Sequence, residues 1–365
     1  MALVKNNAAV GADIANSIVD MSRCRTKNTT IQSPQLPSHA SRVVCVGGSV
    51  IDTVAKSSAK MIVGTSNQGK IHLSHGGVGR NVAEVLGRLG SKPLLYTAIG
   101  DDEGGKSILS HLQQECGVIT TTKSVNVARG YNTAQYLALL DHNSDLVGGV
   151  ADMEALSQIP IPAVEDLRGV DYLVLDSNGP VDVVTRAAKN GVEAGCHVCF
   201  EPTSVPKAQM LSNSAEFVEC LSYVFPNNDE LLAMAEALND GKISLGGNND
   251  SLDEYKAIKD AASILLSRMK SNNAHVIITL GSRGVLLASK KEGADFRHFP
   301  ADIVLESKSS NGAGDTLAGA FIHALLKGGT EMDAVRFGME AALLSLDAEQ
   351  AIPPKLSALQ YKQAT

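Results

Sequence analysis

The chain has 365 residues, of which 44% are hydrophobic, and its formal net charge is −7 with no basic stripe. This length predicts one large or two modest globular domains, and the acidic balance argues against nucleic acid and anionic membranes as partners. No stretch approaches the roughly 18 apolar residues of a membrane-spanning helix, so none is expected. Six scattered cysteines are too few for a disulfide scaffold and favour a reducing compartment.

Residues 1–41 are rich in Asn, Ser, Thr and Ala, and we interpret them as a disordered leader or targeting segment that could contain a short helix near Ala12–Met21. The stretch Arg25–Ser33 has the length of an N-terminal peroxisomal signal, but it lacks that signal's apolar second residue and its final Leu or Ala. A plain disordered tail is the favoured interpretation. These features predict a soluble intracellular protein, in the cytosol or the peroxisomal matrix.

From Arg42 onward, short apolar strands alternate with helical patterns; the strands read VVCVG, LLYTAIG, YLVLD, VCF, YVF and VIITL. This alternation predicts an α/β fold with a Rossmann-type, mostly parallel central sheet flanked by helices on both faces. Ligands of such sheets bind outside the carboxyl ends of the strands. The polar residues that follow the strands are expected to gather there: Ser49, Asp52, Asp101, Asp102, Ser177, Asn178, Glu201, Thr203, Asn227, Glu230, Ser282 and Arg283.

Two stretches, at about 53–75 and 130–150, break the alternation. The second of them reads as a β-hairpin that turns at His142–Ser144. Together they predict a small antiparallel β-sheet beside the main sheet, which we call the lid.

The segment HGGVGRN, ending at Asn81, precedes an amphipathic helix. Gly76 and Gly77 would let a ligand approach the backbone, and Asn81 can both donate to and accept from sugar hydroxyls. Asp52 could accept hydrogen bonds from two neighbouring hydroxyls. A dinucleotide fingerprint is a rival reading, but the GxGxxG spacing fails and no clear strand directly precedes the segment. A simple helix-entry turn, and a helix cap or surface acid at Asp52, remain alternatives.

The segment SSNGAGDTLAGAF places the turn Gly312-Ala313-Gly314 directly before Asp315 and an apolar pattern at helical spacing. No Walker A lysine motif is present, so phosphate chemistry would need another anion site. Backbone N–H groups at a helix N-terminus provide one, and they would stabilise charge on a transferred phosphoryl group. Asp315, kept ionised by the same helix end, would take the proton from an attacking hydroxyl. An ordinary acid in the first helical turn is the alternative.

The segment PNNDE offers Asn227 and Glu230, whose oxygen atoms suit a hydrated Mg²⁺. The segment TLGSRG, from Thr279 to Gly284, would form a loop on the nucleotide side.

Taken together, these segments resemble the ribokinase-like (PfkB) carbohydrate kinase family over roughly residues 42–355, with 356–365 as a C-terminal tail. GGVGRN matches the family's first signature, SSNGAGD its second, PNNDE its N-x-x-E metal motif and TLGSRG its ATP-loop motif, in the right order. The resemblance implies a ribokinase-like core with a β-lid. It also implies phosphorylation of a sugar hydroxyl that depends on ATP and Mg²⁺, and a homodimer formed through the lid.

Carried over to this chain, the resemblance gives each motif a role. Asp315 becomes the general base, and Gly312, Ala313 and Gly314 become the anion hole. Substrate-side candidates are Ser49, Asp52, Gly76, Gly77 and Asn81. Metal and phosphate candidates are Asn227 and Glu230, and ATP-side candidates are Asn227, Thr279, Gly281, Ser282, Gly284, Gly312 and Gly314. The family's D-T-x-G-A-G-D begins with an acid that helps to hold a monovalent cation. Ser309 stands at that position here, which puts a K⁺ requirement in question.

Within the family, the lid segment NTAQYLALLD and the segment FEPTSVPK look like those of pseudouridine kinases. This similarity implies that ATP and pseudouridine give pseudouridine 5′-phosphate and ADP. The extra ring N–H of pseudouridine would be the handle for selection, with Asn132, Thr133 and Gln135 as candidates to contact it. Three alternatives stay open: a kinase for ribose, uridine, adenosine or fructose; a binding module without catalysis; and an NAD enzyme, which lacks its fingerprint.

Overall fold

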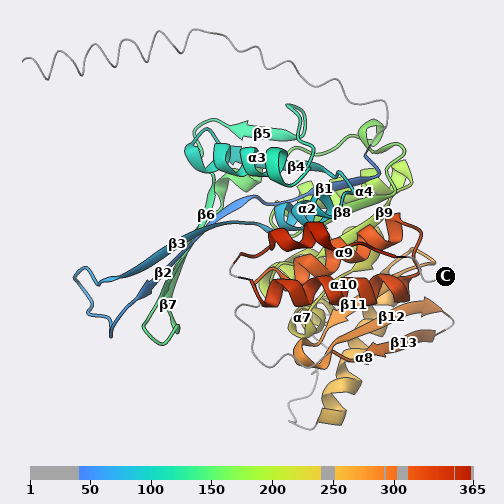
Figure 1. Cartoon of the computed structure of the whole chain (residues 1–365). Coiled ribbons are helices and arrows are strands. Elements are labelled where there is room, and N and C mark those ends of the chain that lie inside the picture. The colour runs from blue at the N-terminus through green and yellow to red at the C-terminus, as the bar shows by residue number, and fades with distance from the viewer. Residues whose placement is uncertain (1–40, 240–250, 292, 302–310, 349, 363–365) are drawn as a thin grey trace, which may run out of the picture. The chain divides into compact units, whose positions relative to one another are not determined.

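The computed structural model describes residues 41–239, 251–291, 293–301, 311–348 and 350–362. The leader before residue 41, with its signal-like stretch Arg25–Ser33, and Ser309 lie outside these residues. The described part contains a large sheet covered by helices and a smaller separate sheet (Figure 1).

The main sheet has nine strands in the order β13-β12-β11-β10-β9-β8-β1-β4-β5. From β11 to β5 the strands run parallel, and β12 and β13 return as an antiparallel hairpin at one edge. Most parallel strands are buried on both faces, which explains why they read as continuous apolar runs. The predicted, mostly parallel sheet is confirmed. Its strands are β1 Val43–Val46, β4 Leu94–Gly100, β5 Val125–Ala128, β8 Tyr172–Asp176, β9 His197–Glu201, β10 Leu221–Val224, β11 His275–Thr279, β12 Val285–Lys291 and β13 Gly293–Phe299.

Helices cover both faces of this sheet, and alternate residues of each strand enter two different cores. In β1, Val43 and Cys45 pack with the helices of one face, whereas Val44 and Val46 pack with those of the other. The first face carries α2 Val78–Arg88, α3 Glu103–Glu115, α9 Ala313–Leu326 and α10 Glu331–Leu346. The second carries α4 Val181–Ala194, α5 Val205–Ser212, α6 Ala215–Glu219, α7 Asn228–Leu238 and α8 Ser251–Arg268.

The short 3₁₀ segment η4 (Pro354–Ala358) also belongs to the fold, because Leu356 is fully buried in the core of the first face. The ordered structure therefore continues past residue 355. Among the described helices, none combines the length and the apolar character needed to cross a membrane.

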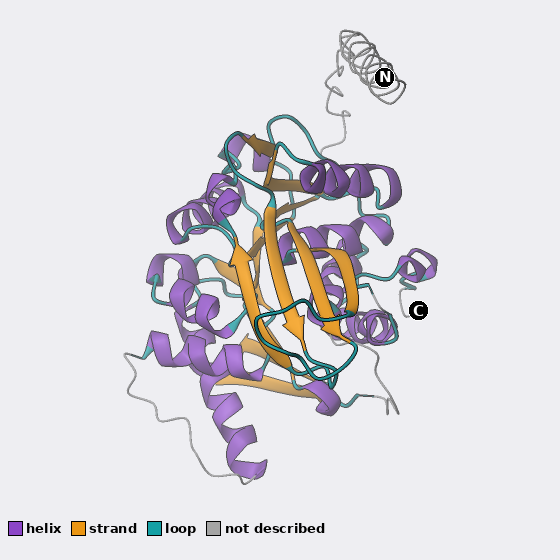
Figure 2. Cartoon of the chain, turned by 90° about the vertical axis from the view of Figure 1, so that its left-hand side faces the viewer, coloured by secondary structure: helices purple, strands orange, loops and turns teal. Residues whose placement is uncertain are grey.

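The lid is a four-stranded sheet in the order β3-β2-β6-β7, and it extends away from the helical body (Figure 1). In Figure 2 its strands lie in front of that body. The hairpin expected at 130–150 is present as β6 and β7, and β2 and β3 form a second antiparallel pair. The expectation of an antiparallel lid is wrong for its central pair, because β2 and β6 run parallel. The reason lies in the main sheet: β2 continues from β1 and β6 follows β5, and those strands are themselves parallel. The lid strands are β2 Val50–Ser57, β3 Gly69–Gly76, β6 Ala134–Leu140 and β7 Leu146–Asp152.

The structure also corrects one reason for rejecting a dinucleotide fingerprint. A clear strand, β3, does end at Gly76, immediately before α2. It belongs to the lid and not to the parallel sheet, so it does not form the βαβ unit that such a fingerprint requires. Gly77 instead enters α2 with a φ of 91°, and a Cβ on it would lie 2.3 Å from the carbonyl oxygen of Gly48.

Candidate active site at the carboxyl ends of the strands

Helix α9 begins at a glycine turn. Gly312 has a φ of 77°, and a Cβ on it would lie 2.3 Å from the carbonyl oxygen of Ala351, so a side chain does not fit. Ala313, Gly314 and Asp315 form the first turn of the helix. The first N–H groups of a helix have no partners inside it. The predicted glycine turn that opens a helix, with an acid in its first turn, is present in the structure, and the anion-binding role of its N–H groups stays a prediction.

Asp315 meets the other glycine-rich motif directly. The side-chain amide of Asn81 donates to Asp315 Oδ2 at 2.7 Å, although the two residues are 234 positions apart. Helices α2 and α9 can approach this closely because Gly319 faces Val85: a Cβ on Gly319 would lie 2.7 Å from the Cβ of Val85. The contact joins the predicted sugar side of the site to the predicted base.

The protonation behaviour of Asp315 differs from the sequence expectation. Burial raises the pKa of Asp315 to about 6, the hydrogen bond from Asn81 and the charge of Arg80 oppose the rise, and the charges of Asp176 and Glu230 add to it. The helix end was expected to favour the ionised form, but the removal of the carboxylate from water outweighs that effect. With a pKa near 6, the carboxylate is still mostly ionised at neutral pH.

Two more carboxylates lie near Asp315. Burial raises the pKa of Glu201, at the end of β9, well above its usual range, and the charges of Asp315 and Glu230 raise it further. Burial also raises the pKa of Glu230. Acids that destabilise one another's ionised forms favour a cation between them, and hard oxygen donors are the ligands that Mg²⁺ prefers.

Asn227 and Glu230 have a second task that the sequence interpretation missed. Asn227 Oδ1 accepts from the backbone N–H of Glu230, and Glu230 Oε2 accepts from the backbone N–H of Asn227, both at 2.9 Å. This reciprocal pair is a capping box that starts α7. The N-x-x-E spacing therefore fixes the helix end in place, while Asn227 and Glu230 both line the adjoining cavity.

The segment TLGSRG is a tight turn between β11 and β12. Gly281 has a φ of 59° at the start of η3 (Gly281–Arg283), and Gly284 has a φ of 92°. A Cβ on Gly284 would lie 2.0 Å from the carbonyl oxygen of Phe299, so this glycine lets the β12–β13 hairpin close on the turn. A β-bridge between Thr279 and Asn227 places the turn beside the start of α7.

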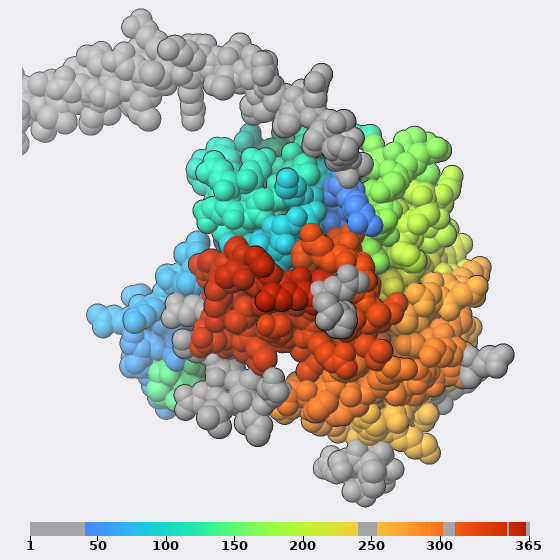
Figure 3. Space-filling model, turned by 45° about the vertical axis from the view of Figure 1, so that its right-hand side comes forward, coloured from blue at the N-terminus to red at the C-terminus, as the bar shows by residue number. Residues whose placement is uncertain are grey.

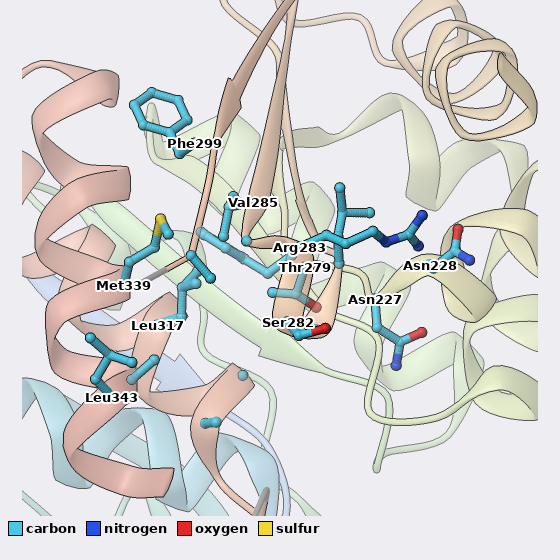
Figure 4. A pocket seen from close by; sticks show the side chains of 18 of the residues that line it. Asn227, Asn228, Thr279, Ser282, Arg283, Val285, Phe299, Leu317, Met339 and Leu343 are labelled. Carbon is cyan, nitrogen blue, oxygen red and sulfur yellow. The ribbon is translucent and has the colours of Figure 1, made fainter. Parts of the chain in front are cut away.

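A cavity of about 1810 Å³ unites most of these residues. It lies between the C-terminal helices and the β11–β13 region, which meet on the same side of the molecule (Figure 3). Figure 4 shows Asn227, Thr279 and Ser282 on one side and the apolar Leu317, Met339 and Leu343 on the other. The sequence-predicted residues that line it are Asn227, Glu230, Thr279, Gly281, Ser282, Gly284, Gly312, Ala313, Gly314 and Asp315.

The predicted substrate-side residues lie outside the lining of this cavity and next to α2. Ser49 is fully buried, and its hydroxyl accepts from that of Thr97 at 3.0 Å. Asp52 lies within β2, and burial raises its pKa to about 6 against the charge of Arg80. A Cβ on Gly76 would lie 1.9 Å from Asp52 Oδ2, so glycine at this position makes room for that carboxylate.

The three lid candidates are not brought together. Thr133 is buried, and its hydroxyl donates to Asp102 Oδ1 at 2.6 Å and accepts from a backbone N–H. Gln135 pairs with Ile51 in the parallel register, so it lies on the lid face opposite to Asp52. Tyr136, which the sequence interpretation passed over, shares the face of Asp52. Asn132 is exposed in the loop before β6.

Asp176 is a further residue that the motif analysis missed. Its Oδ2 accepts from the backbone N–H groups of Gly48 at 2.9 Å and Gly79 at 2.8 Å. It thus ties the end of β8 to the two segments that carry Ser49 and Asn81. A signal was available, because Asp176 is the last residue of the apolar run YLVLD and so had to lie at the ligand-binding edge.

A buried network of charged residues lies along α2, centred on Glu84. In the stretches that the structure describes, one trio brings potential metal-ligand atoms within 4.8 Å of one another: Glu84, His111 and Cys116. Glu84 also pairs with Arg80 and Arg88. Two neighbouring guanidinium groups disfavour a metal ion, so we interpret the trio as part of an ion-pair network that holds Arg80 behind the site.

Comparison with known proteins matches residues 40–358 to the family described as pfkB family carbohydrate kinase. A pseudouridine kinase of Arabidopsis thaliana is 27% identical over 369 residues, which cover 86% of this chain and 92% of that protein. A ribokinase of Haemophilus influenzae is 28% identical over 295 residues, which cover 79% and 87%. The solved structure of Arabidopsis thaliana ribokinase complexed with ribose and ATP is similar at a TM-score of 0.71 and 19% identity, covering 88% of this chain and 98% of that one. That likeness confirms the predicted ribokinase-like fold, and the family match spans nearly the whole described part: the chain belongs to the pfkB family of carbohydrate kinases.

Proposed function

We propose that this kinase transfers the γ-phosphoryl group of ATP to the 5′-hydroxyl of pseudouridine, giving pseudouridine 5′-phosphate and ADP. The observation that carries the phosphotransfer is the buried Asp315 in the first turn of α9, hydrogen-bonded to Asn81 and open to a large cavity. The nucleoside assignment rests on the similarity to the pseudouridine kinase. A kinase for ribose is the second candidate, supported by the ribokinase of comparable identity.

In this mechanism Asp315 is the general base. With a pKa of about 6 it is ionised at neutral pH and accepts the proton of the attacking hydroxyl. The hydroxyl oxygen forms the new bond to the γ-phosphorus, and the bond from that phosphorus to the β,γ-bridging oxygen breaks. The N–H groups of the Gly312–Gly314 turn, at the positive end of α9, stabilise the charge on the transferred group.

On the nucleotide side, Thr279, Gly281, Ser282 and Gly284 would bind ATP. Asn227 and Glu230, with Glu201 beside them, would hold Mg²⁺ through their oxygen atoms. The ion would also offset the repulsion that Glu230 and Asp315 exert on the buried carboxylate of Glu201. When bound, the ion would neutralise phosphate charge. Asp52, Gly77 and Asn81 would bind the sugar and hold its hydroxyl beside Asp315.

The test is phosphorylation by the purified full chain with Mg-ATP and pseudouridine, uridine, ribose, adenosine or fructose. We expect pseudouridine to be the best substrate and Asp315→Asn to lose at least about 10²-fold in kcat. Asp333→Asn, which changes an acid in the first turn of α10, is the matched control and is expected to retain activity. Preference for another sugar would refute the pseudouridine assignment, and an active Asp315→Asn would refute the base.

We further propose a homodimer formed through the lid. Ile71, Leu73, Leu137 and Val150 share one lid face by register and are between 42% and 70% exposed. An apolar cluster of this kind on a monomer's surface is typical of an interaction site. Light scattering is expected to give twice the chain mass for the wild type and the monomer mass for Leu73→Asp. Lys70→Asp, on the opposite face, should remain dimeric; an unchanged mass for Leu73→Asp would refute the interface.

A further inference from the structure

The turn that follows β9 is held against the end of β8. Thr203 has a φ of 70°, which is unfavourable for a β-branched residue. Its hydroxyl accepts from the backbone N–H of Ser177 at 3.2 Å, and its own N–H donates to Glu201 Oε2 at 2.8 Å. These two bonds fix how the chain leaves the sheet and enters α5.

This turn brings Lys207, in the first turns of α5, to Asn178 just beyond β8. Lys207 Nζ donates to Asn178 Oδ1 at 2.6 Å, and Asn178 Nδ2 donates to Asp176 Oδ2 at 2.6 Å. Asn178 also packs on the segment that leads to Ser49, since a Cβ on Gly48 would lie 2.9 Å from the Cβ of Asn178. The lysine is thus tied, through one amide, to the segments on which the proposed sugar site is built.

The electrostatic situation of Lys207 is unusual for a half-buried cation. Its ammonium group has a neutral amide oxygen as partner, and the described residues place no carboxylate within ion-pair distance of it. An ammonium group has three donors, and the bond to Asn178 uses one of them. Two donors therefore remain for a ligand that carries oxygen acceptors.

We propose that Lys207, positioned by Asn178, donates to a carbonyl oxygen of the nucleobase and so selects nucleosides over free sugars. This inference rests on the proposed nucleoside kinase activity. A pentose bound to Asp52 and Asn81 lies by the end of β1. The neighbouring strand β8 is about 4.8 Å away, a distance that a ring attached to the sugar can bridge. A uracil ring presents two carbonyl acceptors, which free ribose lacks.

The chemistry also limits what Lys207 can select. Pseudouridine and uridine carry the same two carbonyl groups, so an ammonium donor alone does not distinguish them. Asn178 bonds Asp176 through its amide nitrogen and Lys207 through its amide oxygen, so we assign it the positioning of Lys207. Lys207 is thus expected to strengthen binding of both nucleosides equally, and discrimination between them has to come from other groups.

Calorimetric binding tests this with two ligands: pseudouridine, and a C-linked phenyl riboside, which keeps the sugar and a ring but has no carbonyl. For Lys207→Met we expect a loss of about 10- to 100-fold in affinity for pseudouridine, and the same loss for uridine. Affinity for the phenyl riboside is expected to change less than about twofold. Lys290→Met is the matched control, since Lys290 is also half-buried and bonded to a neutral oxygen, on β12. Binding of ADP checks that each variant is intact.

The outcomes separate the two proposals. Equal losses of affinity for pseudouridine and the phenyl riboside in Lys207→Met would overturn the carbonyl contact and show a packing role. An unchanged affinity for pseudouridine in this variant would also overturn the contact. A wild type that binds pseudouridine but does not phosphorylate it would refute the proposed activity while the affinities still decide the role of Lys207. A wild type that binds no nucleoside overturns the inference outright.

Discussion

Replacing the proposed base should make the protein more stable as well as inactive. Burial raises the pKa of Asp315 from 3.8 to about 6, which corresponds to about 3 kcal/mol of unfavourable free energy for the ionised group in the fold. The folded protein keeps this proton between about pH 4 and 6, where the unfolded chain has released it. The free energy of unfolding therefore falls as the pH rises through that window and stays lower above it.

Asp315→Asn removes this cost and keeps an oxygen that can accept from Asn81. We expect urea unfolding at pH 7.5 to show a gain of up to about 3 kcal/mol over the wild type, and roughly half of that gain at pH 5. Asp333→Asn is a control of opposite sign, because the hydrogen bond from Thr330 lowers the pKa of Asp333 and favours its charge in the fold. An Asp315→Asn protein no more stable than the wild type at pH 7.5, or a gain that does not shrink at pH 5, would refute the reasoning.

Two further predictions concern the groups around this acid. The wild-type profile of kcat/KM against pH should fall on its acid side near pH 6. Asn81→Leu should move that fall to higher pH, because it removes the hydrogen bond that lowers the pKa of Asp315. An acid-side fall at the same pH in both proteins, measured between pH 5 and 8, would contradict this. Glu84→Gln should cost about 3–5 kcal/mol in urea unfolding because it strips buried Arg80 of its carboxylate partner, whereas Glu216→Gln, in an exposed pair, should change little.

Local sequence patterns were sufficient for the main sheet and for the start of α9. Buried parallel strands are uniformly apolar, and a glycine with positive φ before an apolar helix leaves its mark in a few consecutive residues. The contact between Asn81 and Asp315 was not available in this way, since it depends on how α2 and α9 pack over 234 residues of separation. The raised pKa of Asp315 follows from that packing and could not be predicted without it.

Two other findings differ in whether the sequence could have predicted them. The spacing of Asn227 and Glu230 is also that of a capping box, which sequence alone can suggest. The face of Gln135 could not be read in the same way. A strand shows which residues alternate, but only its pairing with β2 shows which set lies with Asp52. A one-residue shift of that register would have put Gln135 where Tyr136 lies.

The charges at this site explain how a kinase of this kind can work without a phosphate-binding lysine in the glycine turn. Asp176 is engaged by backbone N–H groups, and Arg80 is compensated by Glu84. Asp52, Asp315, Glu201 and Glu230 remain, and burial raises the pKa of each. A polyphosphate that bound here without a metal ion would be repelled by these carboxylates. A polyphosphate that carries a divalent cation would relieve it, and it would also lower the pKa of the acids nearby. The same step that binds the nucleotide would then help to ionise the base.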